Sequence, residues 1–98
     1  MSKISQTQID IATECDDIKN LLLDKNLKYG DSAINPVRIF STADNVEQIK
    51  VRIDDKLSRL RTCAEGDTED VVLDLIGYLV LLRVAQRQQR RLDHFVVV

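Results

Sequence analysis

Cysteine and histidine are scarce in this 98-residue chain, and their positions exclude several kinds of site. The two cysteines, Cys15 and Cys63, lie far apart and have neither CxxC nor Cys/His ligand spacing. The sequence therefore predicts neither a zinc site nor a disulfide framework, and we expect both thiols to be reduced and structural. The single histidine, His94, lies beside the end of the chain, where we do not expect a catalytic role.

The chain also lacks an excess of basic charge and a long apolar segment. Its 14 Lys and Arg residues are balanced by 16 Asp and Glu residues, and the pI near 5.3 argues against nucleic acid as a partner. The longest apolar stretch is too short and too interrupted for a membrane span of about 20 residues, and the N-terminal segment lacks the apolar core of a signal peptide. We therefore expect a soluble cytoplasmic protein without a membrane partner.

Segments that alternate with period two are almost absent, and the one β-prone segment, FVVV at 95–98, is isolated. Apolar residues recur instead at helical spacing. The sequence predicts an all-α fold, a single domain over 1–98 with three main helices at 5–28, 44–62 and from a cap at Asp67 or Thr68 to Leu92. The tail at 93–98 is expected to be flexible or to contact another subunit.

Capping and turn residues indicate where these helices begin and end. Gly30 follows the first predicted helix as a residue that adopts positive φ, and Pro36 disfavours helix just before it, so 31–40 is predicted to be a connector. Asp44 is followed three residues later by Glu47, the spacing of a capping box at the start of the second helix.

The third predicted helix carries apolar residues on every side between Val71 and Ala85. Such a helix is expected to be buried all round, and two other helices in a chain this short cannot enclose it. A second subunit is the simplest cover for the remaining face. We therefore predict a homodimer or higher homo-oligomer in which the helices complete a bundle.

One carboxylate, Asp74, interrupts this apolar helix, although a buried charge costs several kcal/mol unless it is paired, bound to a cation or neutralised. Asp70 and Tyr78 lie one turn to either side of it. The second helix offers a matching set of charged residues: Arg52, Asp54, Asp55, Lys56 and Arg59. Carboxylates on facing helices suit Mg²⁺, whereas a structural ion pair of Asp74 with Arg52, Lys56 or Arg59 needs no metal. The residues alone leave both interpretations open.

The segment from Arg52 to Leu82, RIDDKLSRLRTCAEGDTEDVVLDLIGYLVLL, resembles the helix-turn-helix core of the MazG-like all-α nucleoside triphosphate pyrophosphohydrolases. In that superfamily an ExxE pair and an ExxD pair on successive helices hold Mg²⁺ over the triphosphate. The resemblance implies catalytic roles for Asp55 and Asp74. It implies a metal site formed by Asp54, Asp55, Asp70 and Asp74, and substrate contacts from Arg52, Lys56, Arg59 and Tyr78.

A second segment, LLLDKNLKYGDS at 21–32, resembles the K-N-x-x-Y-G-D segment of a phage-associated family of small helical proteins encoded near nucleotide-modification genes. Phosphate contacts and a stacking ring make four of its residues candidates for substrate binding: Lys25, Lys28, Tyr29 and Ser32. A lysine-rich helix end explains the lysines equally well, but it does not explain Tyr29 or Ser32. Arg38 and Ser41 are further candidates in the connector.

The chain also departs from the MazG-like pattern. Ser58 and Arg59 stand where the second Glu of ExxE is expected, and Val71 stands where ExxD begins, which leaves Asp70 one position early. Fewer carboxylates weaken cation binding, whereas the Arg59 guanidinium is suited to bidentate binding of phosphate. We expect a divergent Mg²⁺-dependent nucleoside triphosphate pyrophosphohydrolase or, alternatively, an inactive module that binds or sequesters a nucleotide or nucleotide-derived signal in the cytoplasm, the host's if the chain is phage-encoded. A purely structural oligomer is the third interpretation.

Overall fold

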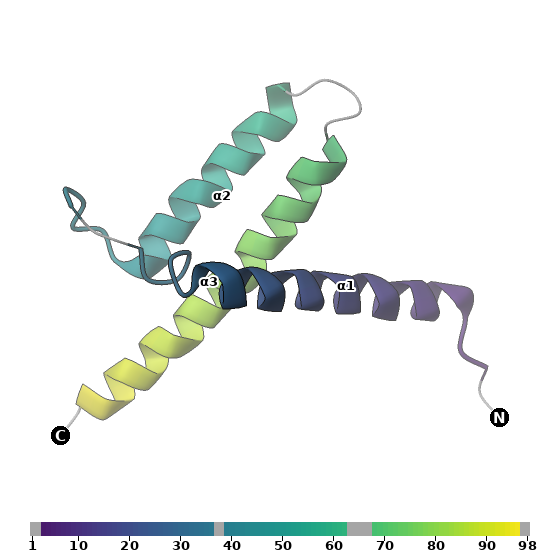
Figure 1. Ribbon diagram of the computed structural model, residues 1–98, viewed down its shortest axis with the longest axis horizontal. Helices are drawn as coiled ribbons and strands as arrows, with labels where there is room; N and C mark the ends of the chain where they lie inside the picture. Colours follow the sequence, from purple (N-terminus) through teal and green to yellow (C-terminus); the bar gives the residue numbers. More distant parts are fainter. Residues whose placement is uncertain (1–2, 37–38, 63–67, 97–98) are drawn as a thin grey trace. The chain divides into compact units, whose positions relative to one another are not determined.

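The computed structural model describes residues 3–36, 39–62 and 68–96. In these ranges the chain forms three α-helices and no strand: α1 (Gln6–Tyr29), α2 (Asn45–Thr62) and α3 (Thr68–Val96) (Figure 1). The all-α prediction is confirmed. Phe95 and Val96, which the sequence marked as β-prone, instead extend α3. Two compact units make up the chain, Met1–Gly30 and Asp31–Val98.

The first unit contains α1, which is capped at both ends. The Ser5 hydroxyl accepts a hydrogen bond from the Gln8 backbone N–H, and the Gln8 side chain accepts one from the Ser5 N–H, each at 3.1 Å. This capping box satisfies two N–H groups that a helix start leaves without partners. No residue of α1 is buried, and Cys15 is a free, exposed thiol.

Gly30 ends α1 with a conformation that favours glycine. Its φ is 65° and its ψ is −153°, so the predicted positive φ is confirmed, but ψ lies outside the left-handed helical region. This combination is accessible almost only to glycine. The Gly30 N–H donates to the Asn26 carbonyl at 2.7 Å, and the Asn26 side-chain amide donates to the Gly30 carbonyl at 3.2 Å.

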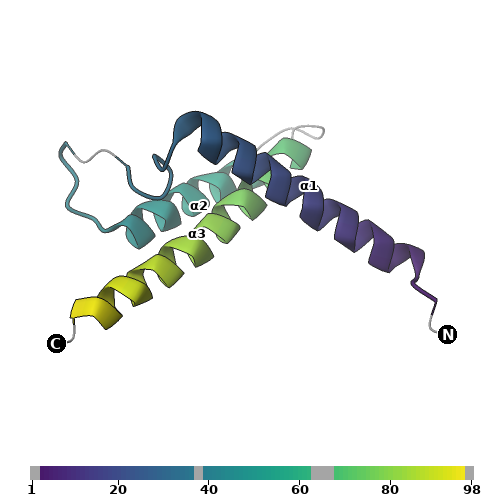
Figure 2. The same ribbon diagram turned by 60° about the horizontal axis from the view of Figure 1, so that its bottom comes forward.

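The second unit is built around α2 and α3, which lie side by side and antiparallel in both ribbon views (Figures 1 and 2). The Asp44 carboxylate accepts from the Glu47 N–H at 2.8 Å and caps α2, as its position in the sequence predicts. Four residues form the buried core of the unit: Ile34, Ile49, Ile53 and Ala85. Leu75, Tyr78, Leu81 and Leu82 of α3 and Val46 of α2 pack against them.

One core residue, Ile34, comes from the predicted connector. The Ile34 and Asn35 N–H groups both donate to the Asp31 carbonyl, at 3.0 and 2.6 Å. This turn follows directly on Gly30, and Ile34 within it is only 7% exposed. The connector therefore contributes to packing, which its turn-forming composition did not indicate.

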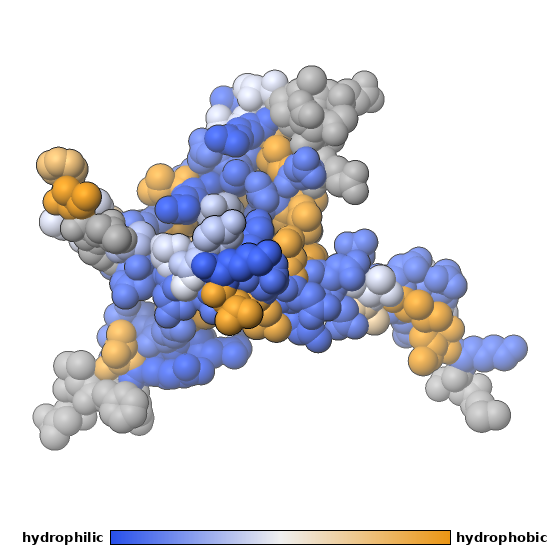
Figure 3. Space-filling view, in the orientation of Figure 1, coloured by the Kyte–Doolittle hydropathy of each residue, from blue (hydrophilic) through white to orange (hydrophobic). Residues whose placement is uncertain are grey.

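Only part of the apolar surface of α3 is covered within one copy of the chain. Apolar residues reach the surface of the α2–α3 pair (Figure 3). The uncovered face of α3 consists of six residues that are 36% to 45% exposed: Val72, Leu73, Ile76, Leu79, Val80 and Val84. Within one copy α2 packs along one side of α3 only, which agrees with the expectation that two other helices cannot enclose it. Cover of the remaining face by a second subunit stays a prediction. None of the helices in the described ranges is long and apolar enough to cross a membrane.

Candidate functional site

Charged and aromatic side chains from α2 and α3 meet along the junction of the two helices. Lys56 Nζ lies 3.2 Å from Asp74 Oδ2 and 5.9 Å from the centre of the Tyr78 ring. Arg52 Nη1 donates a hydrogen bond to the Tyr78 hydroxyl at 3.4 Å. We refer to these four residues, Arg52, Lys56, Asp74 and Tyr78, as the interhelical cluster.

Helical spacing and antiparallel packing together produce this cluster. Lys56 follows Arg52 by one turn on α2, and Tyr78 follows Asp74 by one turn on α3. Because the helices run in opposite directions, one turn forward along α2 matches one turn back along α3. Arg52 is therefore opposite Tyr78, and Lys56 is opposite Asp74.

Burial differs sharply across the Lys56–Asp74 ion pair. The Lys56 side chain is only 14% exposed, whereas that of Asp74 is 42% exposed. Lys56 thus extends its aliphatic stem along the α2–α3 junction and places its ammonium group between a carboxylate and an aromatic face. Asp74 is not the isolated buried charge that the apolar sequence around it suggested. It has a cation on one side and solvent on the other.

The remaining acids of the predicted metal site are not gathered around this pair. Asp55 lies 3.4 Å from Arg59 on its own helix, with both side chains about 60% exposed, and Asp54 and Asp70 are exposed. In 3–36, 39–62 and 68–96, no three His, Cys, Asp or Glu side chains lie close enough together to hold a metal ion. Mg²⁺ takes several oxygen ligands, so a magnesium site formed by these acids stays a prediction.

The candidates around the end of α1 belong to different units. Lys25, Lys28 and Tyr29 lie on α1, where Lys28 pairs with Asp24 at 3.1 Å and Tyr29 is 71% exposed. Ser32 is exposed in the turn that begins the second unit. Joint binding of one ligand by these residues and the interhelical cluster therefore stays a prediction.

Of the two further candidates, Arg38 and Ser41, only Ser41 lies in the part of the chain that the structure describes. Ser41 Oγ accepts from the Ala43 N–H at 3.1 Å, so this hydroxyl has a local structural role before α2 begins. Arg38 lies outside the described residues.

Asn26 is a residue of the K-N-x-x-Y-G-D segment that the sequence argument did not single out. Its hydrogen bonds with Gly30 close the end of α1. The signal was available, since Asn side chains commonly form hydrogen bonds with nearby backbone groups.

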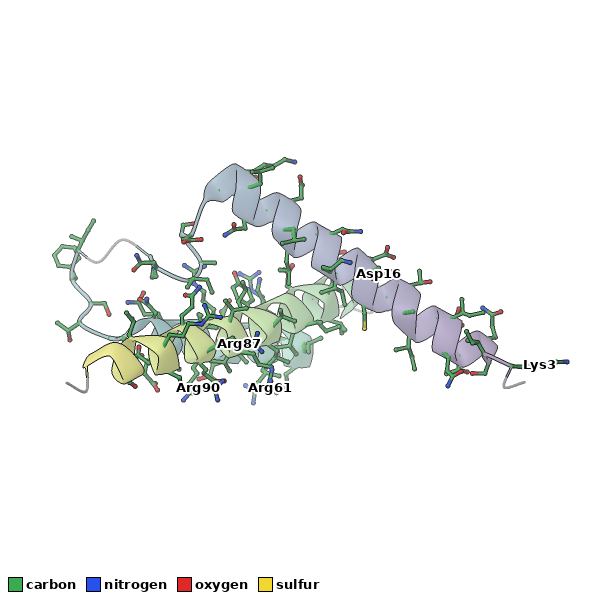
Figure 4. The ribbon with its side chains drawn as sticks, turned by 90° about the horizontal axis from the view of Figure 1, so that it is seen from below. Lys3, Asp16, Arg61, Arg87 and Arg90 are labelled. Carbon is green, nitrogen blue, oxygen red and sulfur yellow. The ribbon has the colours of Figure 1, made fainter. Side chains whose placement is uncertain are left out.

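Four arginines in the second half of α3 are not among the candidate site residues. Arg83, Arg87, Arg90 and Arg91 are all exposed, and Arg87 and Arg90 are labelled in Figure 4. Because α3 extends to Val96, none of them lies in its last turn, where the negative end of the helix dipole acts.

Comparisons with known protein families, with curated proteins and with solved structures give no significant match to this chain. The functional argument therefore depends on the residues of the chain itself.

Proposed function

We propose that the chain is a nucleotide-directed protein that captures a nucleotide or nucleotide-derived small molecule at the interhelical cluster. The observation that supports this most is the position of Lys56, whose side chain is 14% exposed and whose ammonium group lies beside a half-exposed carboxylate. A phosphate group that approaches from the solvent side is able to exchange with Asp74 as the partner of this cation.

Two guanidinium groups extend the cationic surface on either side of Lys56. Arg52 and Arg59 lie one turn before and about one turn after it, both exposed on α2. From Arg52 to Arg59 the helix rises by about 10 Å, so the three cations form a row that suits a chain of phosphates. Guanidinium groups bind phosphate oxygens in bidentate geometry, and such bonds are stronger than neutral ones.

The ion pairs of the candidate catalytic acids favour capture of a ligand over its hydrolysis. Asp55 and Asp74, the residues expected to act in catalysis, each pair with a cation of the chain, Arg59 and Lys56 respectively. A carboxylate in such a pair helps to position the cation, and a metal ion would have to displace that cation. A ligand that binds through Lys56 and the two arginines needs no metal.

A thermal-shift panel of nucleoside mono-, di- and triphosphates and cyclic nucleotides tests this proposal, because ligand binding to the folded state raises the melting temperature by mass action. We expect at least one nucleotide to give a shift that survives EDTA and is lost in Lys56→Met. The matched control, Lys50→Met, removes an exposed lysine of the same helix that pairs with Glu47, and its shift should persist. A flat panel for the unmodified chain, or equal loss in both variants, would contradict the proposal.

Mg²⁺-dependent pyrophosphohydrolysis is the second candidate. Its support is the occurrence of Asp54 and Asp55 on α2 and of Asp70 and Asp74 on the adjacent α3, in a segment that resembles the MazG-like core. The test is release of pyrophosphate from nucleoside triphosphates with Mg²⁺. Turnover that is abolished by Asp74→Asn would establish hydrolysis, and recovery of unchanged nucleotide after denaturation would support capture instead.

We further propose that the protein acts as a homo-oligomer in the cytoplasm. The uncovered face of α3 supports self-association, because it presents six partly exposed apolar side chains on one helix. Contact with a second copy would remove this surface from water and complete a helical bundle.

A further inference from the structure

α1 carries a heptad pattern that has no packing partner in its own unit. Apolar residues occupy four successive positions at alternating intervals of four and three in the middle of the helix: Ile11, Cys15, Ile18 and Leu22. The same spacing continues to Gln8, Lys25 and Tyr29 within α1 and to Ile4 just before it. In heptad notation Ile4, Ile11, Ile18 and Lys25 occupy d, and Gln8, Cys15, Leu22 and Tyr29 occupy a. The four central positions are all apolar, as expected for the seam of a coiled coil.

This stripe is open to solvent in its first half and half-buried further on. No residue of α1 is buried, and Ile11 is 58% exposed, whereas Ile18 and Leu22 are half-buried. Side chains project from α1 all round (Figure 4). Most helical stability in proteins comes from packing of an apolar face, so a helix of this kind needs a partner.

We propose that α1 associates in parallel and in register with α1 of further copies of this chain. The charges beside the stripe support this arrangement. Glu14 occupies g and Lys19 occupies the following e, and in a parallel coiled coil a g residue faces the e residue of the next heptad on the neighbouring helix. Glu14 therefore faces Lys19 of the partner subunit, and the pair is repeated by symmetry.

Most of the other charges of α1 lie outside the seam, with Lys25 at d as the exception near its end. Asp10, Asp17 and Asp24 recur every seven residues at c, which points away from the seam, and all are exposed. Lys19 also lies 3.4 Å from Asp16, but both side chains are more than 60% exposed, and such pairs contribute little. Lys19 is thus free to turn toward the neighbouring helix at small cost.

The residue types do not fix the number of helices, because Leu22 is the only leucine among the four a positions. Leu21 at g and Ala12 at e widen the apolar stripe. We expect two or more copies by native mass spectrometry.

Cys15 provides a direct test of parallel, in-register association. Like positions meet only in that arrangement, since in an antiparallel pair an a residue faces a d residue. In a Cys63→Ser variant of the full chain, mild oxidation should convert most of the protein to a Cys15 disulfide dimer on a denaturing gel. The matched control carries Cys15→Ser and Thr13→Cys, which moves the thiol to the outer f position. Equal crosslinking of the two, or none for Cys15, would overturn the proposal.

A second pair of variants tests the seam without using cysteine. Ile11→Asp places a charge in the stripe, whereas Ile9→Asp makes the same change at a 47% exposed position outside it. By sedimentation, we expect Ile11→Asp to weaken self-association by more than about tenfold and Ile9→Asp by less than about twofold. Association held by α3 alone would leave both variants unchanged. That result would overturn the α1 proposal and leave the proposed function intact.

Discussion

At the scale of single residues, the Lys56–Asp74 ion pair combines a nearly buried cation with a half-exposed anion. Removing the carboxylate leaves Lys56 Nζ with only the Tyr78 ring as a described partner. We predict that Asp74→Asn lowers the free energy of unfolding by about 1 kcal/mol, less than the loss from a fully buried pair because Asp74 reaches solvent. In a domain of this size the melting temperature should fall by about 4–8 °C.

Asp55→Asn is the matched control for this prediction. It also removes a carboxylate that pairs with a cation, but Asp55 and Arg59 are both about 60% exposed on one helix. Such exposed pairs are worth little, so the expected change is within about 0.5 kcal/mol. Equal destabilisation by the two substitutions would show that burial of Lys56 does not strengthen its pair.

Gly30 gives a second prediction at this scale. Nothing lies within 4 Å of a Cβ added there, so any cost of Gly30→Ala comes from the backbone at φ +65 and not from a clash. We expect a loss of about 1–3 kcal/mol and faster hydrogen exchange at the residue 30 amide, which bonds to the Asn26 carbonyl. Ser32→Ala, an exposed change nearby, should leave that exchange rate unaltered.

The residues that sequence alone identified are those whose role is local. Gly30 and Asp44 were assigned from helix-end chemistry, and the backbone confirms both assignments. The Ser5–Gln8 capping box has an equally local signature that our reading of the sequence overlooked. For Asp74 the sequence left three possible cations, because choosing Lys56 requires the register between α2 and α3.

At the scale of helices, α2 stabilises its unit mainly through Ile49, which is 1% exposed. Only four residues in the described ranges make up the buried core, so the loss of one side chain has few neighbours to compensate for it. We predict that Ile49→Ala destabilises the unit by about 2–4 kcal/mol in urea unfolding. Val51→Ala on the same helix, where Val51 is 65% exposed, should change it by less than about 0.5 kcal/mol.

Helix positions were predictable because helical periodicity is a pattern of residues only three or four apart in the sequence. The extent of burial was not predictable, because it depends on what packs against each face. The apolar pattern of α3 indicated that two other helices could not cover it, but it did not show which face would stay uncovered, the one where Leu79 is 45% exposed. Ile34, in the predicted connector, is buried because the turn at Asp31 places it in the core. The exposure of Leu79 and the burial of Ile34 both depend on tertiary packing.

At the scale of the whole molecule, two separate surfaces support self-association of this chain. α1 has a partly exposed heptad stripe, and α3 has an uncovered apolar face. The two surfaces lie on different helices, so separate substitutions test each of them. An assembly that uses both would also explain how a chain with so thin a core gains stability, because binding between copies stabilises the folded state by mass action.

Val80→Glu tests the contribution of α3 to this assembly. Val80 is 39% exposed on the uncovered face, so glutamate is tolerated in an isolated copy but would bring charge into a contact between copies. We predict that sedimentation shows self-association weakened by more than about tenfold, and that the melting temperature loses its dependence on protein concentration. The matched control is Val51→Glu, which places the same charge on α2 at a more exposed valine and should leave both measurements unchanged. If Val80→Glu assembles like the unmodified chain while Ile11→Asp does not, α1 alone holds the copies together and the face of α3 has another role.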